Sequence, residues 1–110
     1  MTIYEEIQAE RVRQDEKWGQ QNLPHVDPVL AQRGASHQRI AEEHEIPTAD
    51  RAKFICQTAA DRGQCSWTAI AVEELSEAVE AHNDPVALRG ELIQLAAVVV
   101  QWVEAIDRAE

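Results

Sequence analysis

The chain has 110 residues, and its 20 acidic residues outnumber its 10 lysines and arginines, so the formal net charge is −10. This length predicts a single domain over residues 1–110. A charge of this sign repels nucleic acid polymers and anionic membrane surfaces, so we expect neither as a partner. A small phosphorylated ligand is compatible with the charge if a divalent cation mediates the contact.

The sequence carries no sign of export or of a membrane span. Its opening, MTIYEEIQAER, is charged and amphipathic and lacks the apolar core of a signal peptide. The longest uninterrupted apolar run, LAAVVV, is too short to cross a bilayer. Cys56 and Cys65 fit neither a disulfide framework nor a CxxC metal pair, which is typical of free thiols in a reducing compartment. We therefore expect a cytoplasmic protein.

Helix signals recur along the chain and strand signals are nearly absent, which predicts an all-α fold. Thr2–Glu5 has the pattern of a capping box, which opens a first predicted helix that runs to about Lys17. Gly19 and Pro24 break the helical pattern. The stretch WGQQNLPHVDP, which begins with Trp18, is therefore predicted to be a loop.

The middle of the chain has weaker signals, followed by a cleaner helix. Asp27 and Pro28 match an N-cap and a first helical position, but Gly34 interrupts the segment 29–44, where we expect only short or frayed helices. Thr48 is the predicted cap of a helix from about residue 49 to 62. The residues expected to point inward from this helix are Phe54, Ile55 and Thr58.

Two long helices complete the predicted fold. Ser66 caps the first, which runs to about His82. Asn83-Asp84-Pro85 is a short connection to the second, over about residues 86–108, so the two helices are expected to be antiparallel neighbours. Their apolar stripes are predicted to comprise Ile70, Val72, Leu75 and Val79 on the first, and Leu88, Leu92, Leu95, Val99, Trp102 or Val103, and Ile106 on the second.

Acidic residues recur on the same two helices at helical spacing. Glu74 and Glu77 are three residues apart, as are Glu91 and Gln94, so each pair occupies one helix face. Glu77 precedes Asp84 in the connection by seven residues, and Glu91 follows it by seven. An antiparallel arrangement therefore places the two pairs at similar height, facing each other.

Carboxylates that converge beside an apolar layer repel one another unless a cation neutralises them. Hard oxygen ligands suit Mg²⁺ or Mn²⁺ rather than zinc. The alternative is a solvated helix face, which is the usual explanation of a lone run such as EELSE. Glu91 and Gln94, however, border LAAVVV, a stretch too apolar to face solvent all round. The combined pattern favours a divalent metal site inside a helical bundle.

The spacing of these motifs resembles a known family. EELSE, followed after thirteen residues by ELIQ, resembles the EExxE…ExxD signature of the MazG-like all-α nucleoside triphosphate pyrophosphohydrolases. The resemblance is firm over residues 67–107. It is fainter over the N-terminal half, where ERVRQDEKWG resembles the opening of phage and actinobacterial members.

The resemblance implies a MazG-like helical bundle that a second subunit completes, in a homodimer or homotetramer. It also implies Mg²⁺-dependent cleavage of a nucleoside triphosphate between the α- and β-phosphates, which releases the monophosphate and pyrophosphate. Glu74, Glu77 and Glu91 would ligate the metal. Glu73 and Glu74 would be the catalytic residues, with Glu73 either supporting the ligands or acting as the base that orients water.

Gln94 departs from the signature, which has Asp at this position. A Gln carbonyl can ligate a hard cation, but it brings no negative charge. Weaker metal affinity is therefore expected, without complete inactivity. The alternative function is a catalytically degenerate helical protein that binds nucleotides or another protein.

The N-terminal helix offers candidates for substrate binding. Arg11, Arg13 and Lys17 are three of only ten positive charges, and they lie close to Trp18. Phosphate binding and base stacking need this mixture of residues. A solvated helix face that ends in a packed tryptophan explains the pattern equally well. Lys53 is a further phosphate-binding candidate.

Overall fold

The computed structural model describes residues 1–109, and within this range the chain forms six α-helices and no β-strand. The all-α class predicted from the sequence is therefore confirmed. The helices are α1 (Ile3–Trp18), α2 (Pro28–Gln32), α3 (His37–Glu43), α4 (Ala49–Asp61), α5 (Trp67–Glu80) and α6 (Pro85–Ala109).

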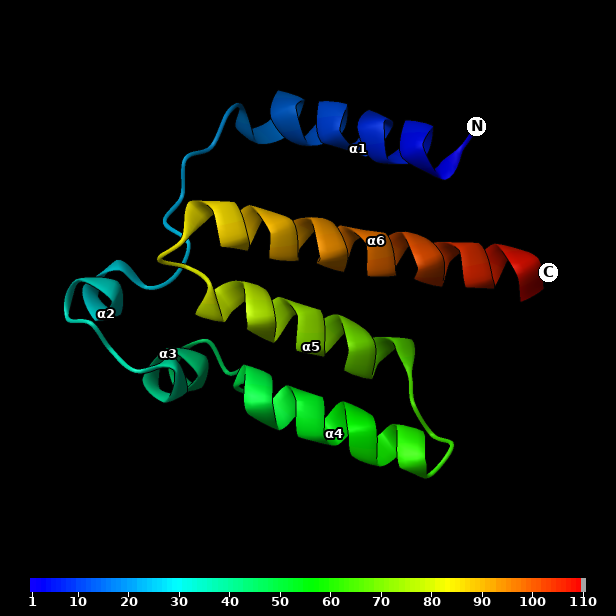
Figure 1. Cartoon of the computed structure of the whole chain (residues 1–110). Coiled ribbons are helices and arrows are strands. Elements are labelled where there is room, and N and C mark those ends of the chain that lie inside the picture. The colour runs from blue at the N-terminus through cyan, green and yellow to red at the C-terminus, as the bar shows by residue number, and fades with distance from the viewer. Residues whose placement is uncertain (110) are drawn as a thin grey trace.

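The four long helices lie side by side in a single layer, in the order α1, α6, α5, α4 (Figure 1). α5 packs against both α6 and α4, and α3 also contacts α5. The chain measures 47 × 44 × 22 Å. Its radius of gyration is 16.0 Å, whereas a compact domain of this length has about 13 Å. A single chain is therefore flat and has two broad, open faces.

The helices begin where local sequence signals place them. The Thr2 hydroxyl accepts a hydrogen bond from the Glu5 amide at 3.1 Å, and the Thr2 amide donates to the Glu5 carboxylate at 2.9 Å, so the predicted capping box is present. Thr48, Ser66 and Asp84 likewise accept from the first turns of α4, α5 and α6. Each such cap contributes about 1 kcal/mol relative to alanine.

Small side chains are buried on the helices that pack against each other. Ala52 of α4 and Ser76 and Ala78 of α5 are 2%, 1% and 1% exposed. Residues two apart on a helix point about 200° away from each other, so Ser76 and Ala78 face opposite sides of α5. Their small size lets α5 approach a neighbour on each side. We call Ala52, Ser76 and Ala78 the small-residue seam.

Half of the 30 large apolar side chains, in contrast, are exposed, and only four of them are buried. The prediction that Phe54 and Ile55 point into a core is wrong for the single chain, because they are 59% and 42% exposed. Leu92 and Val99 of the α6 stripe are exposed as well. The physical reason is the single layer, which leaves the apolar face of each helix without a covering helix from the same chain.

α1 packs weakly against the rest of the chain. Like the short α2, it contributes no buried residue. Two apolar pockets of about 430 and 240 Å³ separate it from α6, and both are lined by Ile7 of α1 and Val100 of α6. The predicted helix is therefore present, but its apolar residues do not close onto its neighbour.

α6 is long and apolar enough to cross a membrane, judged by length and composition alone. Its most apolar 18-residue window has a mean hydropathy of 1.4, and 11% of that window is buried. The sequence-based prediction of no membrane span considered only uninterrupted apolar runs, which polar residues such as Gln94 and Gln101 break. The core helix of an assembly has the same composition.

The exposed surface is large for the mass of the chain. Its accessible area is 8143 Å², whereas a monomer of 12.4 kDa typically exposes about 6,100 Å². The excess is about 2,000 Å². Obligate dimers bury roughly 1,000–2,500 Å² per subunit, so the excess matches the area that one such interface removes from each chain.

We predict that the chain forms a homo-oligomer at micromolar concentration, because association is the direct way to cover this surface. Sedimentation velocity should give at least twice the mass of one chain. Val99→Glu, which places a charge on the open face of α6, should shift the population toward monomer. Val86→Glu, at the highly exposed start of the same helix, is the matched control. A monomeric wild-type protein would contradict the prediction.

Candidate functional site

The connection between α5 and α6 sets the geometry of the acidic residues. α5 ends at Glu80 and α6 begins at Pro85, with Asp84 accepting a hydrogen bond from the Ala87 amide at 3.1 Å. The chain therefore reverses over residues 81–84, and the two helices pack against each other antiparallel, as predicted (Figure 1).

Three carboxylates converge where these helices meet. Glu74 and Glu77 of α5 and Glu91 of α6 each offer one oxygen, and these three oxygens all lie within 4.8 Å of one another. All three side chains are partly buried. The convergence predicted from the sequence spacing is therefore present in the structure. We call these residues the acidic cluster.

The electrostatics of the acidic cluster are unfavourable when all three residues are charged. Burial raises the pKa of Glu74 above its ordinary value of 4.5, and the charges of Glu91 and Glu73 raise it further. Burial likewise raises the pKa of Glu77, with further contributions from Glu74, Glu91 and Glu73. The cluster thus favours either bound protons or a compensating positive charge.

Two oxygens of the acidic cluster lack any partner. Glu74 Oε2 and Glu91 Oε2 are buried and accept no hydrogen bond within the described residues. A buried polar atom left unpaired costs about 1–3 kcal/mol, and more when it carries charge. A divalent cation would satisfy these oxygens. Ligands of octahedral Mg²⁺ stand about 3.0 Å apart when adjacent and about 4.2 Å apart when opposite, so the three oxygens, which lie within 4.8 Å of one another, would have to move closer together around an ion.

The other glutamates of α5 have different surroundings. Glu73 is close enough for its charge to raise the pKa values of both α5 members of the acidic cluster. It also lies beside Cys56, whose pKa is raised to about 11 by burial, by Cys65 and by Glu73. Glu80 is occupied elsewhere, because its Oε2 accepts a hydrogen bond of 2.7 Å from the Ala49 amide at the start of α4.

Gln94 lies on α6 one turn after Glu91, and its side chain is exposed. Its neighbour in the signature, Glu91, is partly buried, so the two residues of the second motif differ in environment. Its role as a ligand stays a prediction.

The predicted substrate-binding residues lie on helices other than the two that carry the acidic cluster. Arg13, Lys17 and Trp18 belong to α1, which lies on the opposite side of α6 from α5, and Lys53 belongs to α4, on the far side of α5 (Figure 1). Trp18 is the last residue of α1 rather than part of the loop, and its exposed ring stands 4.8 Å from the Lys17 ammonium. Arg13 donates to Glu10 at 2.7 Å.

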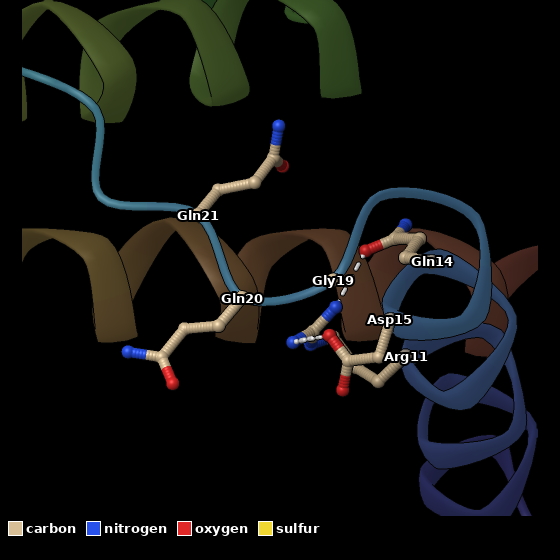
Figure 2. A pocket seen from close by; sticks show the side chains of 6 residues that line it. All are labelled: Arg11, Gln14, Asp15, Gly19, Gln20 and Gln21. Carbon is tan, nitrogen blue, oxygen red and sulfur yellow. Dashed lines mark hydrogen bonds and ion pairs between the residues drawn. The ribbon is translucent and has the colours of Figure 1, made fainter.

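A polar pocket that sequence reasoning did not identify lies at the end of α1. It encloses about 730 Å³ and is lined by Arg11, Gln14, Asp15, Gly19, Gln20 and Gln21. Figure 2 shows the Arg11 guanidinium held by Gln14 and Asp15, each at 2.9 Å, with Gln20 and Gln21 extending from the following loop. The only sequence signal was the polar run GQQ after the helix. Because Asp15 neutralises Arg11, the pocket is not a strong anion site.

No protein family, curated protein or solved structure matches the chain. The resemblance to the MazG-like family thus rests on the motif spacing alone. Function must be inferred from the residues themselves, above all from the acidic cluster.

The raised pKa values have a consequence for the metal-free protein. Between about 4.5 and the raised folded pKa values, Glu74 and Glu77 hold more protons in the folded than in the unfolded chain. The contribution of these two residues to stability therefore falls as the pH rises through this window, and it stays low at neutral pH.

We predict that Glu77→Gln stabilises the metal-free protein at pH 7, because it removes one of three mutually repelling charges. The rise in melting temperature over wild type should be a few degrees, given that about 1 kcal/mol corresponds to roughly 4–8 °C in a small domain. This difference should shrink as the pH is lowered toward 4.5. Glu104→Gln, an exposed carboxyl elsewhere on α6, is the control. A pH-independent difference would contradict the electrostatic explanation.

Proposed function

We propose that the protein is a Mg²⁺-dependent nucleoside triphosphate pyrophosphohydrolase with a MazG-like helical bundle. The single observation that carries this proposal is the acidic cluster, in which carboxylate oxygens of Glu74, Glu77 and Glu91 lie within 4.8 Å of one another, and one oxygen each of Glu74 and Glu91 is buried without a partner. If these carboxyl groups were only protonated, most of their oxygen lone pairs would still lack a partner. A hard divalent cation, either Mg²⁺ or Mn²⁺, fits both the charge and the oxygen donors.

Glu74, Glu77 and Glu91 would hold this cation. When bound, it supplies charge neutralisation for the triphosphate and lowers the pKa of a coordinated water. Glu73, whose charge acts on Glu74 although it is not part of the acidic cluster, would accept the proton of the attacking water. Gln94 would offer a neutral oxygen. The bond broken lies between the α- and β-phosphates, and the products are the monophosphate and pyrophosphate.

Assembly would complete the site. α5 and α6 carry the acidic cluster at the centre of a flat layer whose broad faces expose large apolar side chains. A homodimer or homotetramer would cover these faces and shield the cluster from bulk water. It would also let α1 from a second copy bring Arg13, Lys17 and Trp18 toward the triphosphate, with Lys53 as a further contact. A cytoplasmic location, where triphosphates and Mg²⁺ are abundant, fits this function.

A second function is favoured by one observation, the exposed amide of Gln94 where the family signature has an acid. A helical protein with one charge fewer around its cation would bind a nucleotide or another protein without hydrolysing it. The two functions differ in a single measurement. Only the pyrophosphohydrolase releases pyrophosphate, in a Mg²⁺-dependent manner, from a panel of deoxyribo- and ribonucleoside triphosphates.

We predict that Mg²⁺ raises the melting temperature of the wild-type protein, because only the folded state presents the acidic cluster. At a hundred times the dissociation constant the stabilisation would be about 2.7 kcal/mol. Glu77→Gln should abolish most of this response, and Glu104→Gln should retain it. If Glu77→Gln responds to Mg²⁺ as the wild-type protein does, the metal does not bind between α5 and α6. The same three proteins should rank in the same order for pyrophosphate release.

The role of Gln94 gives a separate prediction. If its carbonyl ligates the cation, Gln94→Glu should lower the Mg²⁺ concentration for half-maximal pyrophosphate release by about tenfold, which corresponds to 1.4 kcal/mol. Gln94→Asp adds the same charge on a side chain shorter by one methylene. Comparing the two variants therefore distinguishes the effect of side-chain length from the effect of the added charge. If Gln94→Leu turns over like wild type, Gln94 lies outside the site and Glu73 becomes the fourth oxygen donor.

A further inference from the structure

The two cysteines of the chain are in direct contact. Cys56 lies on α4 and is partly buried, whereas Cys65 lies just before the N-cap of α5 and is exposed. Their sulfur atoms are 3.8 Å apart, which is van der Waals contact, and both thiols are free. Nothing in their nine-residue spacing indicates this proximity.

The contact is held by a defined turn. Gly63 has φ of +68°, a left-handed conformation that suits glycine. Its amide donates to the Ala60 carbonyl at 2.9 Å, and the Gln64 amide donates to the Ala59 carbonyl at 2.8 Å. These bonds close the end of α4 in the manner of a Schellman motif. After this turn the chain runs back alongside the last turns of α4, so that the Cys65 side chain contacts that of Cys56.

We propose that Cys56 and Cys65 form a reversible intramolecular disulfide, which makes the α4–α5 turn a site of redox modification. The oxidant is a low-molecular-weight disulfide such as oxidised glutathione. The deprotonated sulfur of the exposed Cys65 attacks one glutathione sulfur, and the other glutathione leaves as a thiolate. Cys56 then loses its proton, attacks the sulfur of Cys65 and displaces the second glutathione. Because the pKa of Cys56 is raised to about 11, this second attack should be the slower one. The protein loses two protons and two electrons, and the oxidant is reduced to two glutathione molecules.

Cross-linking would fasten α4 to the start of α5 next to Glu73, whose carboxylate lies beside Cys56. The closed loop is short, because it spans only residues 56–65. It contains the turn that already holds the two sulfurs together, so oxidation should stabilise the present fold rather than distort it. The proposal depends only on this geometry and is independent of the proposed hydrolase activity.

The test uses the full chain, equilibrated with oxidised and reduced glutathione, and then alkylated and analysed by mass spectrometry. The expected product has lost two hydrogens, retains no glutathione, and yields a peptide linked between Cys56 and Cys65. Its melting temperature should exceed that of the reduced protein by roughly 5–15 °C, since a ten-residue loop is closed in the unfolded chain.

Single serine variants give the controls. Cys56→Ser should retain one glutathione on Cys65, because no neighbouring thiol displaces it, and Cys65→Ser should react more slowly because Cys56 is partly buried. Three results in the wild-type protein would overturn the proposal: two thiols that stay free, stable glutathione adducts on both cysteines, or a cross-link between chains on a non-reducing gel.

Discussion

The short connection between α5 and α6 is the constraint on which the rest of the structure depends. Because Asp84 caps α6 and Pro85 begins it, the chain reverses direction within a few residues. This reversal forces Glu77 and Glu91, seven residues to either side of Asp84, to the same height on neighbouring helices. A longer or more flexible connection would let the two helices slide past each other, and repulsion would then separate the carboxylates.

Packing through the small-residue seam works against this repulsion. The seam holds α4, α5 and α6 close enough to keep the acidic cluster partly buried, and burial is the main cause of the raised pKa of Glu74 and Glu77. The long helices lie in one layer (Figure 1), and this arrangement leaves many of the larger apolar side chains exposed. In this arrangement the acidic cluster lies between α5 and α6, whereas large apolar side chains lie on the broad faces. The proposed metal site and the proposed assembly therefore follow from the same architecture.

Local signals made the helix boundaries and the acidic cluster predictable from the sequence. Caps such as Thr48 and Ser66 act over three residues, and the convergence of Glu77 with Glu91 follows from helical periodicity and a short link. Sequence periodicity shows which face of a helix is apolar, but not whether the same chain covers it, so the burial of Phe54 was wrongly predicted. The contact between Cys56 and Cys65 depends on the exact path of a turn, which spacing alone does not encode.

The small-residue seam also determines how the chain would tolerate mutation. In most globular domains the largest buried side chains are the most sensitive positions, because truncating them leaves cavities. Among residues 1–109 of this chain, Ile40 is the one large side chain that is 2% exposed or less, and the others buried to that extent are Ala52, Ser76 and Ala78. Ala52 and Ala78 should therefore be sensitive to enlargement, because larger side chains at such buried positions strain the packing. A substitution scan of this protein should therefore find two classes of sensitive position. Larger residues should destabilise the protein in the small-residue seam, and polar residues should destabilise it on the open apolar faces.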